Sequence, residues 1–315
     1  MVSATKREKM KVNITVVMPA YRESREQISQ AIESILRQTY TKFEYIIVLD
    51  DPHNNDLQDL IEEYANRDKR IKLYVNEKNG GCPYSKDRGI RLANSEYIAI
   101  MDSDDLAYPQ RLERQLEKIE QDKLDLIASY VRVVDEDGFP LYNMDNLPLL
   151  HEQIAKKMKI NNCLPHPTWF LKKEMYLSLG GYTNIQGCED YDFLIRAINA
   201  GYQLGVVNEI LLDYRLSTHS VSRNNLYRQY LMMQFIQDKY YKHQMNYDSY
   251  EEFESVKYTE KKAMHYAKAS VAFEKGIEAK ARKQYLKMLY YVMKTFLTSK
   301  EYAKKIVRYI LQELN

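Results

Sequence analysis

Three carboxylates stand within four residues at positions 102–105, in the order Asp-Ser-Asp-Asp, directly after the apolar run Tyr97–Met101. In an extended strand, residues two apart face the same side, so we expect Asp102 and Asp104 to converge. Such carboxylates repel one another unless a positive charge lies among them, and a hard divalent cation meets that need. The segment therefore predicts Mg²⁺ or Mn²⁺ shared with substrate phosphates. The alternative is that Asp104 and Asp105 only form a turn or cap the following helix.

A second acidic cluster, Glu189-Asp190-Tyr191-Asp192, opens the amphipathic segment Phe193–Ala200. Acidic residues in the first turn of a helix interact favourably with its dipole, by a few tenths to about 1 kcal/mol, so a structural interpretation is available. The functional interpretation is a general base, a carboxylate that takes a proton from a substrate hydroxyl. The cluster by itself leaves both interpretations open.

The elements that must position these clusters alternate along the first two hundred residues. Short apolar runs are separated by amphipathic stretches, which is typical of a mostly parallel sheet covered by helices on both faces. The sequence therefore predicts a doubly wound α/β core. We expect strands at Ile14–Met18, Tyr45–Leu49, Ile71–Val75, Tyr97–Met101 and Leu124–Val134, and helices at Arg25–Arg37, Asn55–Arg67, Pro83–Ala93 and Pro109–Glu120.

Ligands bind such sheets outside the carboxyl ends of the strands, so the residues after each apolar run are the first candidates for a site. Polar or acidic groups recur at these positions, more regularly than scattered surface charge would. They are Pro19-Ala20-Tyr21-Arg22-Glu23, Asp50-Asp51, Asn79-Gly80-Gly81 and the cluster at 102–105.

The pattern changes from about Asn225 onward. Proline is absent, glycine occurs only at Gly276, and Tyr, Lys, Met and Leu recur at helical spacing. We expect an α/β domain over 1–224, followed by a C-terminal subdomain of three to five helices over 225–315 that ends in a helical hairpin. Tyrosine is abundant in this part, and helix packing explains it better than sugar stacking does.

Composition bounds the class of protein. With 315 residues, 45% hydrophobic and 29% charged, the chain is typical of a globular protein and not of a disordered one. Cys82, Cys163 and Cys188 are too few and too scattered for a disulfide framework or a zinc site, so we expect free thiols in a reducing cytosol. No apolar run approaches the roughly 20 residues of a membrane span, and the N-terminus does not read as a signal peptide. We expect no nucleic-acid partner.

The net charge of +2 is unevenly distributed. Residues Lys257–Asn315 contain 14 Lys and Arg against 5 Glu, a net charge of +9, which leaves −7 for the rest of the chain. Apolar residues such as Leu286, Leu289, Tyr290 and Met293 recur there at helical spacing. One interpretation is a helix that packs through this stripe and exposes its lysines to solvent. The other is a basic amphipathic surface that docks on anionic lipid.

The ordered set of motifs resembles glycosyltransferase family 2 from about Ile14 to Ser222. It comprises Pro19-Ala20-Tyr21, Asp50-Asp51, Asn79-Gly80-Gly81 with Gly89-Ile90, Asp102-Ser103-Asp104-Asp105, Gly180-Gly181-Tyr182, Glu189-Asp190 and Tyr214-Arg215. Each motif is weak alone, but the set in this order and spacing is specific. The resemblance implies the Rossmann-like GT-A fold, with a nucleotide-binding half over about 12–105 and an acceptor half over about 106–224. The nearest relatives by resemblance are bacterial enzymes that build capsular and other surface polysaccharides.

The resemblance also implies a role for each candidate residue. Asp51 would hydrogen-bond the uracil ring of a UDP-sugar, and Asp102 would lie near the ribose and the donor sugar. Asp104 would hold the metal that bridges the diphosphate, so Asp104 and Asp102 are the candidate metal-site residues. Asp190 would be the catalytic base, with Glu189 orienting it or touching the acceptor. The nucleoside pocket would be lined by Pro19, Ala20, Tyr21 and Glu23.

Three positions depart from the family pattern. The loop after Asp51 reads Pro52-His53-Asn54-Asn55 where a glycine and a serine are common. Lys86 replaces an arginine near the nucleotide, and a lysine offers a point charge in place of a bidentate fork. The histidine that often follows the Tyr-Arg pair by two residues comes two residues later, at His219, which we retain as a further candidate metal ligand. Trp169, the chain's single tryptophan, is expected in the core because an apolar strand follows it.

The resemblance implies an inverting hexosyl or N-acetylhexosaminyl transfer to an acceptor hydroxyl of a glycan or a lipid-linked glycan. We expect a cytoplasmic protein, with peripheral contact to the inner face of the membrane through the basic helices and homodimerisation as further expectations. One rival is a sugar-phosphate nucleotidyltransferase, which would need a glycine-rich basic loop after the first strand. Another is an inactive nucleotide- or carbohydrate-binding adaptor, which would bind donor without hydrolysing it.

Overall fold

The computed structural model describes residues 13–183, 185, 187–216, 226–241 and 258–313. The chain divides into two compact units, one formed by residues 1–128 and 166–181 and the other by 129–165 and 182–315. The predicted boundary at 224/225 falls among residues 217–225, outside the described part. It remains a prediction.

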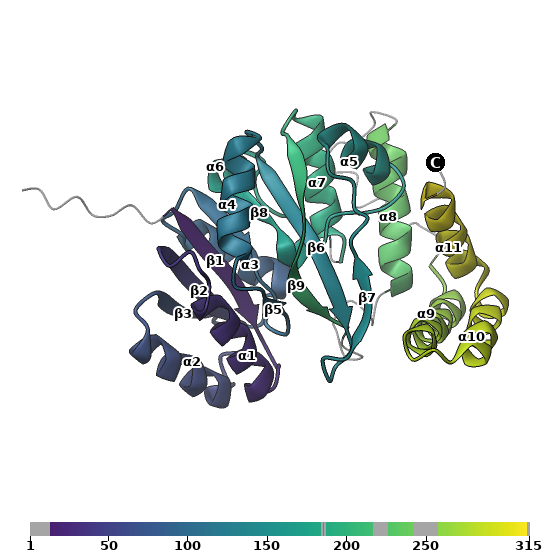
Figure 1. The fold of residues 1–315 in the computed structure, drawn as a ribbon, viewed down its shortest axis with the longest axis horizontal. Coiled ribbons are helices and arrows are strands. Elements are labelled where there is room, and N and C mark those ends of the chain that lie inside the picture. The colour runs from purple at the N-terminus through teal and green to yellow at the C-terminus, as the bar shows by residue number, and fades with distance from the viewer. Residues whose placement is uncertain (1–12, 184, 186, 217–225, 242–257, 314–315) are drawn as a thin grey trace, which may run out of the picture. The chain divides into compact units, whose positions relative to one another are not determined.

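The first unit is built on a mixed sheet with the strand order β3-β2-β1-β4-β8-β6 (Figure 1). Its first four strands are parallel, whereas β8 runs antiparallel to β4 and to the first residues of β6. The strands are β1 (Ile14–Ala20), β2 (Phe43–Leu49), β3 (Ile71–Val75), β4 (Tyr97–Ile100), β5 (Leu106–Ala107), β6 (Leu126–Val134) and β8 (Phe170–Lys172).

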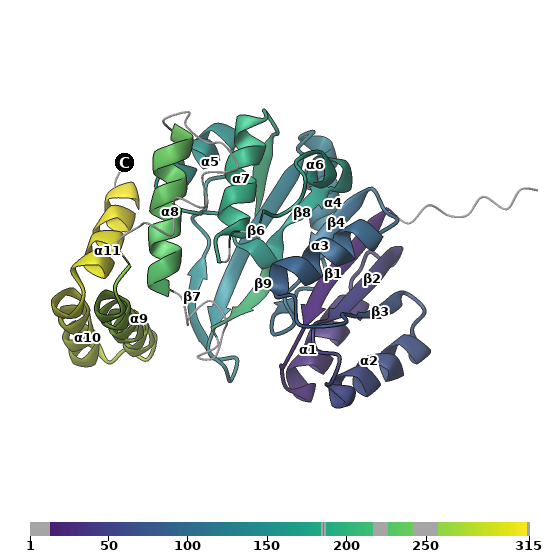
Figure 2. The ribbon, with the colours of Figure 1, turned by 180° about the vertical axis from the view of Figure 1, so that it is seen from behind.

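The central strands are apolar because both of their faces are covered. Every residue of β1 and of β2 is buried, which accounts for the continuous hydrophobic runs in the sequence. Helix α3 lies on one face, in front of the sheet in Figure 2, while α1 and α2 lie side by side and are linked by an ion pair between Arg25 and Asp56. The helices of this unit are α1 (Arg25–Leu36), α2 (Asn55–Arg67), α3 (Cys82–Leu92), α4 (Arg111–Gln121) and α6 (Lys173–Ser178), with the short η1 (His166–Thr168).

Local sequence signals explain where the helices begin. Ser24 and Gln27 form a reciprocal capping box at the start of α1, and the Asn54 side chain accepts a hydrogen bond from Leu57 N at the start of α2. Gly81 precedes α3 with a φ of 86°, a conformation that favours glycine. The predicted strands and helices of this half are therefore confirmed, with ends shifted by a few residues at most.

Helix α3 approaches the sheet closely at Gly89. A Cβ atom at this position would lie 2.5 Å from Val17 Cγ1 and 3.3 Å from Val48 Cγ2. Only glycine permits this spacing without movement of β1 or β2. The close approach fixes the height at which the first turn of α3 meets the carboxyl ends of the strands.

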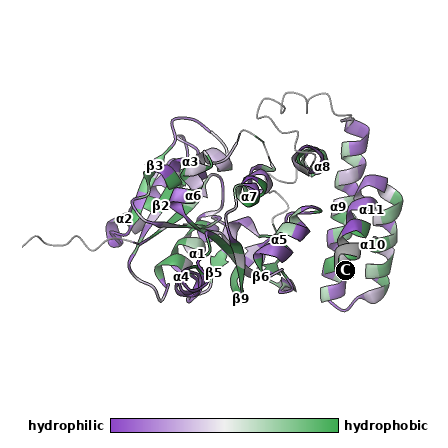
Figure 3. Ribbon diagram, turned by 90° about the horizontal axis from the view of Figure 1, so that it is seen from above, coloured by the Kyte–Doolittle hydropathy of each residue, from purple (hydrophilic) through white to green (hydrophobic). Residues whose placement is uncertain are grey.

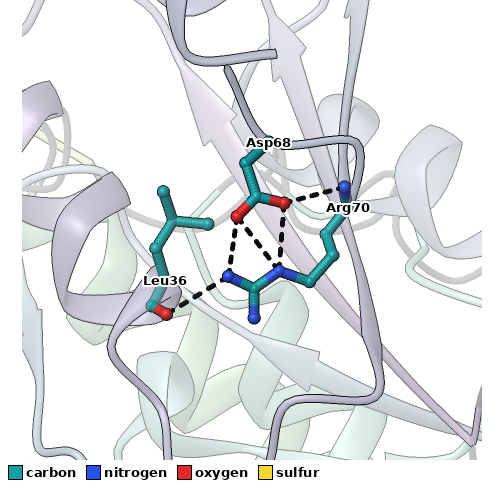
Figure 4. A network of polar contacts seen from close by, with 3 residues as sticks. All are labelled: Leu36, Asp68 and Arg70. Atoms are coloured by element: carbon teal, nitrogen blue, oxygen red, sulfur yellow. Dashed lines mark hydrogen bonds and ion pairs between the residues drawn. The ribbon is translucent and has the colours of Figure 1, made fainter. Parts of the chain in front are cut away.

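A partly exposed network of polar contacts links the start of β3 to the end of α1 (Figure 4). Arg70 Nη2 donates to Leu36 O at 3.3 Å, and the same guanidinium pairs with Asp68 at 2.7 Å. The guanidinium also lies 4.5 Å from the centre of the Phe43 ring. These contacts hold α1, β2 and β3 together at the amino-terminal ends of the two strands.

The second unit continues β6 from Ser129 and adds β7 (Pro140–Met144), which runs antiparallel to β6, and β9 (Leu204–Arg215), which is hydrogen-bonded to β6. A bidentate ion pair joins Arg132 on β6 to Asp213 on β9, with N–O distances of 2.8 and 2.7 Å. Helices α5 (His151–Met158) and α7 (Glu189–Asn199) belong to this unit, as do the tail helices α8 (Leu226–Tyr241), α9 (Glu260–Ala281), α10 (Tyr285–Thr298) and α11 (Lys300–Glu313).

The tail forms four helices within its described residues, as the helical periodicity predicts. Helices α9 and α10 make a hairpin whose turn includes Lys283 with a φ of 58°, and Gln284 N donates to Ala279 O at 2.7 Å to close the end of α9. Tyrosines supply much of the packing, in a cluster formed by Tyr227, Tyr230, Tyr266, Ala269 and Tyr302. For these residues the packing interpretation of the tyrosine-rich tail is confirmed.

Arg282, directly after α9, contacts the turn between β6 and β7. Arg282 lies 3.5 Å from Asp135 and 4.6 Å from the centre of the Phe139 ring. Among the described helices, none has both the length and the apolar character that a bilayer crossing requires.

Candidate active site

The carboxylate of Asp50, directly after β2, organises the glycine turn before α3. It accepts hydrogen bonds from Gly80 N at 2.9 Å, Gly81 N at 2.8 Å and Asn76 Nδ2 at 2.5 Å. Asp50 is buried, so its carboxylate is hydrogen-bonded to the backbone of this turn and is shielded from solvent. Of the paired aspartates in the sequence, Asp50 is therefore the structural member.

Asp51 lies beside the segment that follows β1. The Arg22 guanidinium is 3.6 Å from the Asp51 carboxylate and 4.7 Å from the centre of the Tyr21 ring. Tyr21 N donates to Glu23 Oε2 at 2.8 Å, and Asn54 Nδ2 donates to Tyr21 O at 3.1 Å. The structure thus brings together Tyr21, Glu23 and Asp51, three of the predicted nucleoside-pocket residues.

Pro19 and Ala20 are the last two residues of β1 and are buried. Ala20 O accepts from Asp50 N at 2.7 Å, which closes the edge of the sheet at this point. The unusual loop after Asp51 forms a compact turn, because His53 N donates to Asp51 Oδ1 at 3.1 Å and Asn54 caps α2. Despite its unusual sequence, the loop keeps Asp51 close to Tyr21, because both contact the Arg22 guanidinium.

Residues 102–105 form a turn and not an extended strand, which corrects the geometry assumed from the sequence. Strand β4 ends at Ile100, and Asp105 N donates to Asp102 O at 3.3 Å. Asp102 and Asp104 are nevertheless partly exposed, whereas Ser103 and Asp105 are buried. The capping alternative for α4 is wrong, because its N-cap residue is Gln110.

The protein itself supplies positive charge to this acidic turn. Lys86 Nζ lies 2.6 Å from Asp102 Oδ1, and the lysine side chain is only 2% exposed. Burial lowers the pKa of Arg111 to about 10, while the negative charges of Asp105 and Asp102 act in the opposite direction. Arg111 is thus charged at neutral pH. Repulsion among the carboxylates does not by itself require a metal, which weakens that part of the sequence argument.

Arg111 also fixes the turn mechanically. Its Nη2 donates to Ile100 O at 2.6 Å and to Pro167 O at 2.8 Å, and its Nε donates to Gln115 Oε1 at 3.0 Å. The sequence analysis missed this residue. A signal was present, because Arg111 and Gln115 share a helix face with the apolar Leu112 and Ile119.

His166 lies behind the Lys86–Asp102 pair. Its Nδ1 is 3.5 Å from Lys86 Nζ, and its ring meets Trp169 edge-on at 4.4 Å. Partial burial and then the charge of Lys86 lower the pKa of His166 well below its usual range, so the imidazole is neutral at pH 7. Trp169 is fully buried, which confirms its expected place in the core.

The donor set at the acidic turn fits a magnesium-type ion. Within the described ranges no three His, Cys, Asp or Glu side chains are grouped so as to hold a metal. Mg²⁺, however, is commonly held by one or two carboxylates, with phosphate and water oxygens completing its shell. The partly exposed Asp104 and Asp102 satisfy that requirement. His219, the third predicted ligand, lies outside the described residues.

The second acidic cluster separates into two kinds of residue. Asp192 is fully buried, pairs with Arg196 at 2.8 Å and accepts from Thr183 Oγ1 at 2.7 Å, so it is structural. Glu189 and Asp190 are partly exposed at the start of α7. Glu189 Oε2 accepts from Gly187 N at 2.8 Å, which ties its carboxylate to the preceding loop.

Asp190 is oriented by Asn162, a residue that the sequence analysis missed. Asn162 Nδ2 donates to Asp190 Oδ2 at 2.8 Å, and Asn162 Oδ1 accepts from Leu164 N at 3.1 Å, which fixes the direction of the amide. Ile160 O in the same loop accepts from Gln237 Nε2 of α8 at 2.7 Å. A tail helix therefore braces the loop that holds Asp190.

The chain is similar to known proteins of one family. Residues 15–179 match the family model described as glycosyl transferase family 2. The chain is 34% identical over 225 residues to an uncharacterized glycosyltransferase of Methanocaldococcus jannaschii, covering 70% of this chain and 78% of that protein. It is 31% identical over 215 residues to an O-antigen biosynthesis glycosyltransferase of Escherichia coli, covering 68% and 83% of the two chains.

The fold is shared with a solved structure of lower sequence similarity. Residues 1–349 of TarS from S. aureus superimpose with a TM-score of 0.56 at 16% identity, covering 96% of this chain and 92% of that one. This likeness concerns the fold alone, which is the predicted GT-A fold with a C-terminal helical region. The family match over residues 15–179 and the 34% identity to the Methanocaldococcus jannaschii protein show that the chain belongs to glycosyl transferase family 2.

Proposed function

We propose that the protein transfers a hexosyl or N-acetylhexosaminyl group from a UDP-sugar to an acceptor hydroxyl, with inversion at the anomeric carbon. Family membership supports sugar transfer. The observation that carries the finer proposal is that the chain keeps partly exposed carboxylates in both acidic clusters, at Asp104 and Asp190, while their neighbours Asp105 and Asp192 are buried. An adaptor that had lost its chemistry would not need these two exposed groups.

On the donor side, Tyr21, Glu23 and Asp51 would bind the nucleoside, with Asp51 accepting a hydrogen bond from the uracil ring. Asp102, held by Lys86, would face the ribose and donor sugar. Asp104 and Asp102 would hold Mg²⁺ or Mn²⁺, which when bound neutralises charge on the departing diphosphate. Lys86 would add a fixed positive charge behind this turn.

On the acceptor side, Asp190 would remove the proton of the attacking hydroxyl, and Glu189 would contact the acceptor or help to orient Asp190. Surface-polysaccharide synthesis is the context we propose. Relatives carry names that point there, such as the O-antigen enzyme above and an amylovoran biosynthesis glycosyltransferase of Erwinia amylovora, 25% identical over 202 residues. The acceptor would be a glycan or a lipid-linked glycan met at the cytoplasmic face of the membrane.

A panel of nucleotide sugars tests the proposal directly. We expect metal-dependent hydrolysis of one UDP-sugar in the absence of acceptor, together with thermal stabilisation by the same compound. Stabilisation without any hydrolysis would favour the adaptor alternative. The nucleotidyltransferase alternative is set aside by the family match.

Arg22 holds Tyr21 and Asp51 close together. We therefore expect the nucleotide site to prefer UDP over GDP. Calorimetric titration with Mg²⁺ present should show UDP binding at least about tenfold more tightly than GDP, because a site built to pair with one base leaves polar groups unpaired with another. Asp51→Ala should remove the preference. Asp56→Ala, which alters an exposed acid of α2 paired with Arg25, serves as the matched control and should leave it intact. Equal or tighter GDP binding would contradict the prediction.

The hydrogen bond from Asn162 to Asp190 predicts a positioning role. Asn162→Ala should lower kcat for transfer about tenfold with donor KM little changed, because a hydrogen bond to a charged group contributes about 1.5–3 kcal/mol. Asn162→Asp should lower kcat further, since it places a second carboxylate against the first. In an Asp190→Asn background, Asn162→Ala should have almost no additional effect. Additive losses in the double variant would show that Asn162 acts only on the fold of its loop.

A further inference from the structure

Helix α10 is largely apolar, as its green colour in Figure 3 shows, and one of its faces is exposed to solvent. Leu286 and Leu297 are 86% and 84% exposed, and Leu289, Tyr290 and Met293 are each more than half exposed. These positions follow one another at helical spacing and so form a continuous stripe. The stripe, residues 286, 289, 290, 293 and 297, is called here the bare face of α10.

The opposite face of α10 is already occupied. Thr295 is fully buried, and Tyr291 and Val292 meet α9 where it carries Gly276, with a Cβ there lying 3.5 Å from Tyr291 Cβ and 3.9 Å from Val292 Cγ2. The packing interpretation of the tail therefore holds for the face of α10 that contacts α9, and not for the bare face. A helix that is apolar on both faces needs a second apolar environment.

The charged residues of helix α10 are all basic. Helix α10 contains Lys287 and Lys294 and no acidic residue, and both lysines are exposed. Lys283 precedes the helix and Lys300 follows it, and both are exposed. The segment Lys257–Asn315 as a whole carries a net charge of +9. An apolar stripe on a helix that carries lysines and no acidic residue complements an anionic, partly apolar surface.

We propose that the bare face of α10 docks on anionic lipid, with the helix lying in the plane of the bilayer surface. The apolar side chains would enter the boundary between headgroups and acyl chains, Tyr285, Tyr290 and Phe296 would lie at headgroup level, and the lysines would contact lipid phosphates. A second copy of the chain fits less well. An antiparallel two-fold pairing of α10 through this face would bring Lys287 and Lys294 of both copies together, at a cost in repulsion.

Flotation of the purified full chain with vesicles tests the proposal without any donor or acceptor, so its outcome is independent of the proposed reaction. We expect binding to phosphatidylglycerol-containing vesicles at low salt, loss of that binding at high salt, and little binding to phosphatidylcholine alone. The double variant Leu286→Asp, Met293→Asp and the double variant Lys287→Glu, Lys294→Glu should each bind at least about tenfold more weakly. All four side chains are exposed, so neither double variant should change the melting temperature.

Leu150→Asp provides the matched control, because Leu150 is also a well-exposed leucine (60%) but lies at the start of α5. Its vesicle binding should equal that of the unaltered chain. Equal binding to neutral and anionic vesicles, or no binding at low salt, would overturn the proposal. So would a dimer in light scattering that Leu286→Asp dissociates, since the occupant of the bare face would then be a second copy.

Discussion

Replacing Asp190 by Asn should lower the rate of sugar transfer by a factor of about 10² to 10⁴, the usual contribution of a general base. The asparagine keeps the size of the side chain and its place opposite Asn162 but does not accept the proton of the acceptor hydroxyl. Single-turnover transfer with saturating donor measures the effect. Donor affinity, followed by calorimetry, should change little, because Asp190 belongs to the acceptor side of the proposed reaction.

Asp192→Asn is the matched control, two residues further along α7. Asp192 is fully buried and paired with Arg196 at 2.8 Å, so its neutralisation leaves a buried cation without its anion and should lower the melting temperature. Asp190→Asn should melt close to the unaltered protein. A collapse of donor binding in Asp190→Asn, with transfer from bound donor preserved, would place Asp190 in the nucleotide pocket and contradict its role as the base.

Removal of the divalent cation should abolish turnover, and Asp104→Asn should lower it by about 10³-fold or more even with excess Mg²⁺ or Mn²⁺. The reason is that charge builds on the departing diphosphate, and stabilisation of that charge by a metal contributes several kcal/mol. Rates with and without a chelator, followed by restoration with each metal, measure the requirement. Circular dichroism should show that Asp104→Asn keeps its fold, because the side chain is partly exposed.

Asp105→Asn separates metal binding from the stability of the turn. Asp105 is buried, and its negative charge acts on the buried guanidinium of Arg111. We expect this variant to lose melting temperature but to keep its dependence on the metal concentration. Full activity of the unaltered protein in excess chelator would exclude the metal role of Asp104 and Asp102.

The acidic turn at residues 102–105 was predicted from the sequence only in part. The Asp-Ser-Asp-Asp motif and its place after an apolar run are visible in the sequence, but the extended geometry assumed for it is wrong. The turn closes through Asp105 N and Asp102 O, and its charges are matched by Lys86 and Arg111. Lys86 lies on helix α3, sixteen residues before Asp102, so no local sequence pattern could pair the two residues.

The sequence by itself determined the strands and helices of the α/β core, the motifs that follow the parallel strands, and the family. These depend on short-range features: apolar runs for strands buried on both faces, capping residues such as Ser24 and Asn54, and glycine where φ is positive. Only the tertiary structure decided which polar residues form hydrogen bonds with one another. Asp50 meets Gly80 and Gly81 across thirty residues, and Asn162 meets Asp190 across twenty-eight.

The tail shows the same division. Helical spacing determined that its segments are helices, and both apolar stripes of α10 were available for packing. Which stripe is buried depends on where α9 lies, because Gly276 admits Tyr291 and Val292 and leaves Leu286 and Met293 in solvent. Periodicity describes one helix at a time, whereas burial is a property of two surfaces that meet, and that meeting exists only in the folded chain.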